Sequence, residues 1–217
     1  MLKYKKYFGF TISELLMALG IIGIIAAMTV PAVIENLHKR TFVAQLKSII
    51  SEVQQIAQNQ MALKGTKDLG STDFSSTSKL FKDSNFIITK KCSAENAFAD
   101  CWGSTKYKYI NKSGEYEVTY KNSIVLKNGV ILGYSIYKNQ NITGQNEKTY
   151  GLFIVDINGL DKPNVVGRDL FKFYISEKGN IYPSTSPGSS TVSSCTTTGN
   201  IESCTDLIIK DGWQMNY

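Results

Sequence analysis

The residues best suited to chemistry lie close together between residues 156 and 169. Five oxygen-bearing side chains occur in this stretch: Asp156, Asn158, Asp161, Asn164 and Asp169. Ca²⁺ takes about six to eight oxygen ligands, partly from backbone carbonyls, and such a stretch beside a strand end can supply them. The spacing is not that of an EF-hand, because Gly159 comes too early and no glutamate closes the stretch. We therefore expect a calcium loop. The alternative is a turn in which Asx side chains cap their own backbone.

The four cysteines occur as two pairs, Cys92/Cys101 and Cys195/Cys204, with eight residues between the members of each pair. Zinc sites usually have closer cysteine spacing with histidine support, and the single histidine, His38, is far away in the sequence. Three pairings of four cysteines are possible, and the two local pairings need the shortest loop closures. We expect these two local disulfides, which indicate an oxidising compartment outside the cytoplasmic membrane.

Glu14 directly precedes the most apolar segment of the chain. Residues 15–34 are twenty residues without a formal charge, and a helix of that length rises about 30 Å, the thickness of a bilayer's hydrocarbon core. An acid at the edge of such a segment is costly in lipid. Lys3, Lys5 and Lys6 precede the segment, which predicts a cytoplasmic N-terminus and export of the rest of the chain.

The apolar segment is more than the core of a secretory signal peptide. Cleavage near Ala27 or Ala32 would be the simplest alternative, but the run exceeds the about 7–15 residues of a signal-peptide core. The helical pattern also continues beyond it, with apolar residues at helical spacing: Phe42, Leu46, Ile49, Ile50, Val53, Ile56, Ala57 and Met61. We expect one helix from about residue 10 to about residue 63, apolar all round in its first half and one-sided in its second.

Gly9-Phe10-Thr11-Ile12-Ser13-Glu14 followed by an apolar helix resembles the cleavage and methylation signal of type IV pilins and type II secretion pseudopilins. The resemblance covers residues 1–63. It implies cleavage after Gly9 by an inner-membrane prepilin peptidase and N-methylation of the new terminal Phe10. It also implies that Glu14 matches the family glutamate and Pro31 the proline of the hydrophobic helix, both with a role in assembly. The loop at 156–169 resembles, more loosely, the acidic calcium loop of some pseudopilins.

The resemblance has a physical basis at these residues. Gly9 has no side chain to exclude a protease from the backbone. After cleavage, Phe10 carries an α-ammonium, and Glu14 of a neighbouring subunit can neutralise it, whereas in one subunit the helix dipole already favours the acid. Pro31 removes a helical hydrogen bond, so we expect residues 20–31 to be a compliant segment that partly unwinds on assembly.

The exported part of the chain is predicted to be rich in β-strands, and we expect an α+β, pilin-like fold in which the long helix packs on an antiparallel sheet. Asn128-Gly129 predicts a hairpin with a type I′ turn within residues 123–137. The other expected elements are a polar connection at 65–84 with a helical turn near 78–82, and strands at 116–121, 150–156, 170–176 and 181–182. Residues 184–200 would be disordered without the loop between Cys195 and Cys204.

Four segments follow from this interpretation: a leader (1–9), a membrane or filament-core helix (10–34), an amphipathic helix (35–64) and an exported domain (65–217). The net charge of +6 includes three leader lysines and forms no basic stripe, so we predict no nucleic-acid binding. No hydrolase, nucleotide-binding or metalloprotease motif is present, so we predict no enzyme.

The predicted function is that of a structural subunit in a pilin-like filament, with a type II secretion-like pseudopilin favoured. The alternatives are a type IV pilus subunit for adhesion, motility or DNA uptake, and a solitary membrane-anchored binding domain. The resemblance implies the prepilin peptidase, an inner-membrane assembly platform and other pilin-like subunits as partners, in a homo- or hetero-polymer. The expected location is a single pass through the bacterial inner membrane, then a periplasmic or extracellular filament.

Overall fold

The computed structural model describes residues 9–76, 79–81, 84–93, 100–103, 106–111, 113–119, 122–136, 140–197 and 199–217. The first eight residues of the expected leader lie outside this range, as does part of the expected helical turn near 78–82. The chain divides into two compact units, residues 1–38 and 39–217. The two units are described separately.

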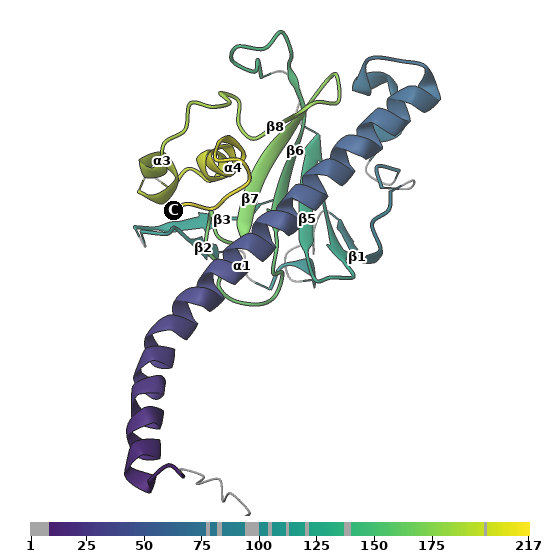
Figure 1. Ribbon diagram of the computed structural model, residues 1–217. Coiled ribbons are helices and arrows are strands. Elements are labelled where there is room, and N and C mark those ends of the chain that lie inside the picture. Colours follow the sequence, from purple (N-terminus) through teal and green to yellow (C-terminus); the bar gives the residue numbers. More distant parts are fainter. Residues whose placement is uncertain are drawn as a thin grey trace, which may run out of the picture. The chain divides into compact units, whose positions relative to one another are not determined.

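Helix α1 runs without a break from Ile12 to Lys64 (Figure 1). It begins after Thr11, whose hydroxyl accepts a hydrogen bond from the backbone N–H of Glu14 at 3.2 Å, so that the first turn is capped. It ends at Gly65, which has a φ of 61°. The amide of Thr66 then donates to the carbonyl of Met61 at 3.0 Å, which closes the last turn. The predicted continuous helix is confirmed.

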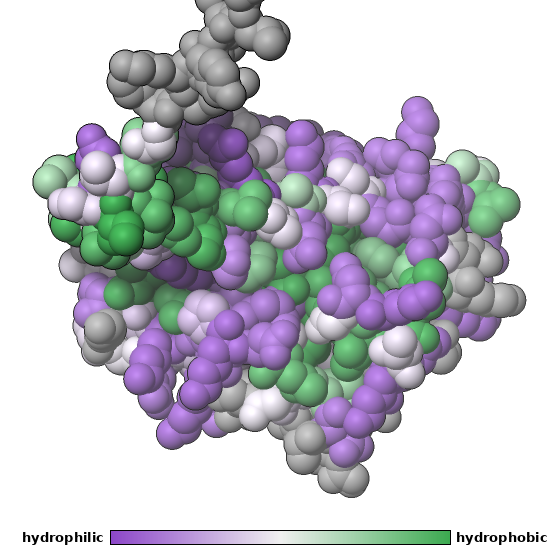
Figure 2. Space-filling model, turned by 60° about the horizontal axis from the view of Figure 1, so that its bottom comes forward, coloured by the Kyte–Doolittle hydropathy of each residue, from purple (hydrophilic) through white to green (hydrophobic). Residues whose placement is uncertain are grey.

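In the first unit, α1 is apolar and exposed on all sides. Its large apolar side chains at Leu15, Met17, Ile21, Ile24 and Met28 are all more than half exposed, and the hydrophobic colouring of this segment is visible in Figure 2. By length and composition the helix can cross a membrane, and no residue of its most apolar window is buried. A surface of this kind needs lipid or other protein around it.

Pro31 lies inside α1 and does not interrupt it. Proline has no amide hydrogen to donate to the carbonyl four residues earlier. Two residues before it, the hydroxyl of Thr29 donates to the carbonyl of Ile25 at 3.0 Å, an arrangement that often bends helices. Residues 20–31 are helical in this single chain, and the expected unwinding on assembly stays a prediction.

The second unit contains an antiparallel sheet of six strands in the order β1-β4-β5-β6-β7-β8 (Figure 1). Its strands are β1 (Ile88–Ser93), β4 (Asn122–Leu126), β5 (Ile131–Ile136), β6 (Thr149–Asp156), β7 (Leu170–Ser176) and β8 (Ile181–Tyr182). A separate hairpin pairs β2 (Lys106–Lys108) with β3 (Glu115–Glu117). The remaining described elements are helices: η1 (Leu69–Ser71), η2 (Asp73–Ser75), α3 (Val192–Thr196) and α4 (Ile201–Lys210). The predicted α+β class, with a long helix on an antiparallel sheet, is confirmed.

Each face of the sheet has its own core, because successive residues of a strand point to opposite sides. On one side, the second half of α1 packs against Phe153, Val155 and Phe171. The buried residues of α1 on this side are Val43, Leu46, Ile49, Ile50, Val53, Ile56, Ala57, Gln60 and Met61. On the other side, Ile154 and Leu170 pack against residues of α4, of the β2–β3 hairpin and of both disulfides.

Two local expectations in this unit are corrected. The strand expected at 116–121 is observed only as the shorter β3, Glu115–Glu117, and Val118 after it is buried in the second core, whereas residues 120 and 121 lie outside the described residues. The expected type I′ turn is also absent, since the amide of Gly129 donates to the carbonyl of Leu126 and Asn128 does not take a positive φ. The loop therefore has three residues, with Gly129 at a φ of 88° in the left-handed position.

The packing of α1 on the sheet gives a direct test at Leu46, which has no exposed surface. We expect Leu46→Ala to lower the free energy of unfolding by about 2–5 kcal/mol, because the lost burial is accompanied by a cavity. Chemical denaturation of the full chain in a non-ionic detergent measures this change. Leu63 lies on the same helix and is 76% exposed, so Leu63→Ala is the matched control and should change stability by no more than about 0.5 kcal/mol. Equal losses in both variants would contradict the packing described here.

Candidate functional site

Gly9 and Phe10 lie just before α1 in non-helical backbone and are exposed. A Cβ built on Gly9 would meet no atom within 4 Å, and the side chain of Phe10 is 89% exposed. The peptide bond between them is therefore open to a protease that binds extended backbone. This accessibility is what the resemblance requires of the two residues.

Thr11 and Glu14 bind each other in the first turn of α1. The Glu14 Oε2 atom accepts hydrogen bonds from the Thr11 amide at 2.9 Å and from the Thr11 hydroxyl at 2.8 Å. Together with the bond from the Glu14 amide to the Thr11 hydroxyl, this is a capping box. The Thr-x-x-Glu pattern is readable in the sequence, although Thr11 was not among the expected functional residues. In the single chain the acid is thus held at the helix entrance by Thr11.

Asp156 ends β6 and organises the loop that follows. Its side chain is fully buried; Oδ1 accepts the amides of Asn158 at 3.2 Å and Gly159 at 2.8 Å, and Oδ2 accepts the hydroxyl of Tyr107. Burial raises the pKa of this carboxyl to about 7, against the opposing effect of its hydrogen bonds. Protein donors bond to both oxygens, so Asp156 holds the turn, as in the Asx-capped alternative.

Asp169 precedes β7 at the other end of the loop and is also fully buried. Its Oδ1 accepts the amide of Val165 at 2.7 Å, whereas Oδ2 has no hydrogen-bond partner. Burial, together with the negative charge of Asp156, raises the pKa of Asp169 to about 8. A buried carboxylate oxygen without a donor is costly unless a proton or a cation reaches it.

The two asparagines of the loop also present buried oxygens. The Asn158 amide group donates to the carbonyls of Asp161 at 2.9 Å and Pro163 at 3.3 Å, which directs its Oδ1 elsewhere, and this Oδ1 has no partner. The Oδ1 of Asn164 is likewise buried without a partner. Asp161, by contrast, is exposed.

Backbone hydrogen bonds connect the sequence neighbours of both asparagines to Asp169. The amide of Ile157, next to Asn158, donates to the carbonyl of Asp169 at 2.8 Å. The amide of Val165, next to Asn164, donates to the Asp169 carboxylate. The described residues contain no group of three or more His, Cys, Asp or Glu side chains arranged for a metal. The available donors are therefore the oxygens of Asn158, Asn164 and Asp169, a hard set that fits Ca²⁺ when backbone carbonyls and water complete it.

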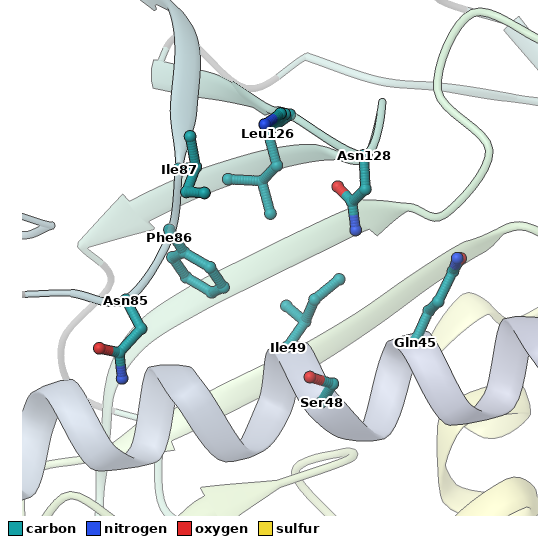
Figure 3. A pocket seen from close by; sticks show the side chains of 9 residues that line it. Gln45, Ser48, Ile49, Asn85, Phe86, Ile87, Leu126 and Asn128 are labelled. Atoms are coloured by element: carbon teal, nitrogen blue, oxygen red, sulfur yellow. The ribbon is translucent and has the colours of Figure 1, made fainter.

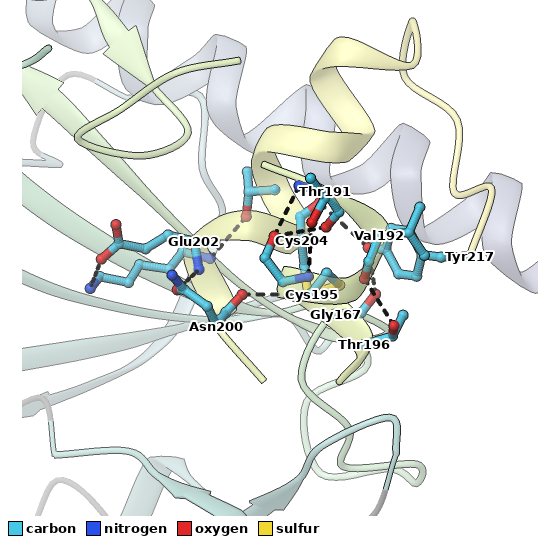
Figure 4. Close-up of a disulfide and its surroundings, with 12 residues drawn as sticks. Gly167, Thr191, Val192, Cys195, Thr196, Asn200, Glu202, Cys204 and Tyr217 are labelled. Atoms are coloured by element: carbon cyan, nitrogen blue, oxygen red, sulfur yellow. Dashed lines mark hydrogen bonds and ion pairs between the residues drawn. A yellow bond between two sulfur atoms is a disulfide. The ribbon is translucent and has the colours of Figure 1, made fainter. Parts of the chain in front are cut away.

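The two disulfides join Cys92 to Cys101 and Cys195 to Cys204, in the local pairing. The second one ties α3 to α4 and lies against Gly167 of the loop (Figure 4). Tyr217 donates its hydroxyl to the carbonyl of Gly167 at 2.9 Å. Neither Tyr217 nor Tyr107 was expected at this site, because each reaches the loop from a segment far away in the sequence.

A groove of about 540 Å³ opens beside the second half of α1 (Figure 3). Its lining comes from three segments: Gln45, Ser48 and Ile49; Asn85, Phe86 and Ile87; and Leu126, Lys127 and Asn128. The side chains are apolar groups, amides, one hydroxyl and one lysine.

The buried acids predict how stability depends on pH. In the folded chain Asp156 and Asp169 hold protons up to a pH of about 7 and about 8, whereas the unfolded chain releases them near the ordinary pKa of 3.8. The folded state thus binds more protons in this interval, and its stability falls as the pH rises from 3.8 towards 8. Urea unfolding of the full chain in detergent and chelator should show this decline.

The decline should be smaller in Asp169→Asn, which removes one of the two titrations, and unchanged in Asp161→Asn, whose carboxyl is exposed. A wild-type stability that is constant across the interval would contradict the burial of these carboxyls.

Comparison with known proteins gives one result, at the N-terminus. Residues 4–30 match the family model described as the prokaryotic N-terminal methylation motif. No curated protein and no solved structure matches the chain significantly. The match covers Gly9, Phe10, Glu14 and most of the apolar segment of α1, whose geometry is described above. The chain therefore carries a type IV pilin-like prepilin signal, which supports a type IV pilin-like, membrane-anchored subunit in general.

Proposed function

We propose that this chain is the precursor of a filament subunit, and that it acts as a pseudopilin in a type II secretion-like system. The observation that carries the proposal is the prepilin signal at the start of one helix that is apolar and exposed in its first half. A solitary membrane-anchored domain needs the apolar half but has no use for the processing motif. In a filament both features have a role.

The subunit first resides in the cytoplasmic membrane. The lysines of the leader keep the N-terminus in the cytoplasm, and the disulfides form in the exported domain. The prepilin peptidase cleaves after Gly9, and Phe10 is methylated. During assembly the apolar half of α1 moves from lipid into the packed helices of the filament core. The same apolar side chains therefore contact lipid first and neighbouring helices afterwards.

Glu14 directs this assembly. In the single chain its carboxylate accepts two hydrogen bonds from Thr11 and is exposed, which leaves it accessible to a neighbour. Pairing with the Phe10 ammonium of the adjacent subunit offsets the cost of placing either charge among apolar helices. Arrangements without this pair leave a buried charge unpaired, so the pair favours helices staggered by one subunit.

The chain itself performs no catalysis in this proposal, as is usual for pilin-type structural subunits. Cleavage and methylation belong to the prepilin peptidase, and an inner-membrane assembly platform drives extraction from the membrane. The pseudopilin assignment is preferred to a pilus subunit because of the loop at 156–169, whose buried oxygens suit a calcium ion.

Processing and assembly can be tested together on wild type and Glu14→Ala. In native cells, mass spectrometry of the mature protein should show a methylated Phe10 as the first residue in both. Wild type should form multimers that cross-linking in intact cells detects, whereas Glu14→Ala should lose them at least about tenfold, because an unpaired ammonium among apolar helices costs several kcal/mol. Glu35→Ala, which removes an exposed acid from the same helix, is the matched control and should assemble.

A wild-type N-terminus at or beyond residue 27 would overturn the proposal in favour of a cleaved signal peptide. Loss of assembly in Glu35→Ala equal to that in Glu14→Ala would contradict the role given to Glu14.

We also propose that the loop binds Ca²⁺ through Asn158, Asn164 and Asp169. These are the loop residues with buried oxygens that lack a hydrogen-bond partner. A bound Ca²⁺ would neutralise the Asp169 carboxylate and join the end of β6 to the start of β7. It would thereby stabilise the part of the exported domain that carries the C-terminal helices.

Calcium should raise the melting temperature of the full chain, since a ligand that binds the folded state alone stabilises it. At 100 times the dissociation constant, the gain is about 2.7 kcal/mol. Scanning fluorimetry in detergent, with calcium or chelator, measures the shift. Asp169→Asn should lose most of it and Asp161→Asn should keep it. A wild type that does not respond, or an equal loss in both variants, would remove calcium from this loop.

A further inference from the structure

The loop at 156–169 is packed directly against a disulfide at Gly167. This glycine has a φ of +82°, and a Cβ built on it would lie 2.6 Å from the Sγ of Cys204 and 3.2 Å from the Sγ of Cys195. At such distances no other residue fits without displacing the backbone or the disulfide. The sulfur atoms therefore form the surface on which this part of the loop rests (Figure 4).

Gly167 lies inside the tight turn that positions Asp169. Within this turn the carbonyl of Val165 accepts the amides of Arg168 at 3.0 Å and Asp169 at 3.2 Å, and the Gly167 amide donates to Leu170 at 3.0 Å. The Asp169 carboxylate closes the turn by accepting the Val165 amide at 2.7 Å. A shift of Gly167 is thus transmitted to Asp169 through few covalent bonds.

Tyr217 contacts both the loop and the segment that carries the disulfide. The hydroxyl of Tyr217 donates to the carbonyl of Gly167 at 2.9 Å and lies 3.5 Å from the carbonyl of Cys204. It therefore connects the loop with the helix α4 that bears one cysteine of the disulfide. Loop, disulfide and Tyr217 form one packed group.

We infer that the Cys195–Cys204 disulfide is a positioning element for the cation loop, so that the loop has its full calcium affinity only when this disulfide is closed. The inference rests on the calcium binding proposed above. The oxidised disulfide holds the turn at Gly167, and the turn holds the Asp169 oxygen where the oxygens of Asn158 and Asn164 can share a cation. The affinity is consequently low before export, in a reducing compartment, and rises after oxidation.

The other disulfide provides an internal comparison. Cys92 and Cys101 are also buried, and they belong to the same core. No atom of either residue is among the closest neighbours of Gly167. Opening this disulfide removes a cross-link of equal sequence separation, 9 residues, but leaves the support of the turn in place.

The first experiment measures the calcium dissociation constant of the full chain in detergent by isothermal titration calorimetry. Gly167→Ala and the double variant Cys195→Ser/Cys204→Ser should weaken binding by about 10–100-fold, the usual effect of losing a group that positions a metal ligand. Gly144→Ala is the matched control, because Gly144 has a φ of +76° and no atom within 4 Å of a Cβ. Cys92→Ser/Cys101→Ser is the second control, and both controls should bind as wild type does.

Circular dichroism at the titration temperature verifies that each variant is folded. If the double variant of Cys195 and Cys204 does not fold, Tyr217→Phe replaces it, since this change removes one hydroxyl and keeps the disulfide. Tyr217→Phe should still weaken calcium binding measurably. Wild-type affinity in Gly167→Ala and in Tyr217→Phe would overturn the inference, whereas a wild type that binds no calcium would overturn the calcium proposal itself.

The second experiment uses the unmodified chain and the reciprocity of linked equilibria. Dithiothreitol supplies two electrons and two protons to convert a disulfide into two thiols, and the reagent closes to a cyclic disulfide. The measured quantity is the ratio of reduced to oxidised dithiothreitol at which half of the Cys195–Cys204 disulfide is reduced. Saturating calcium should raise this ratio by the factor by which reduction of the disulfide weakens calcium binding. Cys92–Cys101 should not shift. Alkylation and mass spectrometry follow each pair, and equal behaviour of the two disulfides would overturn the inference.

Discussion

The burial of one stripe of α1 against the sheet is the interaction on which the exported unit depends. Leu46 and Ala57 have no exposed surface, and they belong to the same core as the stacked rings of Phe153 and Phe173, whose centroids are 5.2 Å apart. Apolar burial contributes about 25 cal/mol per Å², and this interface is where a helix and a six-stranded sheet both exclude water.

The opposite face of the sheet is held differently. Its core is built from short elements, the β2–β3 hairpin and α4, that bury little surface each, and both disulfides lie in it. This face also receives the buried carboxyls of Asp156 and Asp169. Three protein donors bond to the Asp156 carboxyl, but burial outweighs them and raises its pKa to about 7. Asp169 has one buried carboxylate oxygen without a hydrogen-bond donor. Burial of this charged group costs free energy at the loop, and a cation bound there would reduce that cost.

The long elements were predictable because their signals are local and repeated. The apolar spacing between residues 42 and 61 matches the buried face of α1, and the expected strands at 150–156 and 170–176 correspond to β6 and β7. Shorter elements were not. Helix α4 has an Asn200 cap and apolar residues at helical spacing, yet no helix was expected in its ten residues, which adjoin a stretch rich in serine and threonine. The hairpin turn differed because Asn128 uses its side chain to accept the Val130 amide and leaves the positive φ to Gly129.

The sequence by itself determined the features that need only neighbouring residues: the cleavage motif before an apolar helix, the capping pattern of Thr11 and Glu14, the amphipathic stripe and the local cysteine pairs. Tertiary structure decided which oxygens of the loop are used and which are available. The hydroxyl of Tyr107, 49 residues earlier in the sequence, donates a hydrogen bond to one carboxylate oxygen of Asp156. Gly167 contacts the disulfide formed by Cys195 and Cys204. Such contacts depend on how distant segments pack, and packing is decided by the shape of the whole core, which no local pattern of residue types contains.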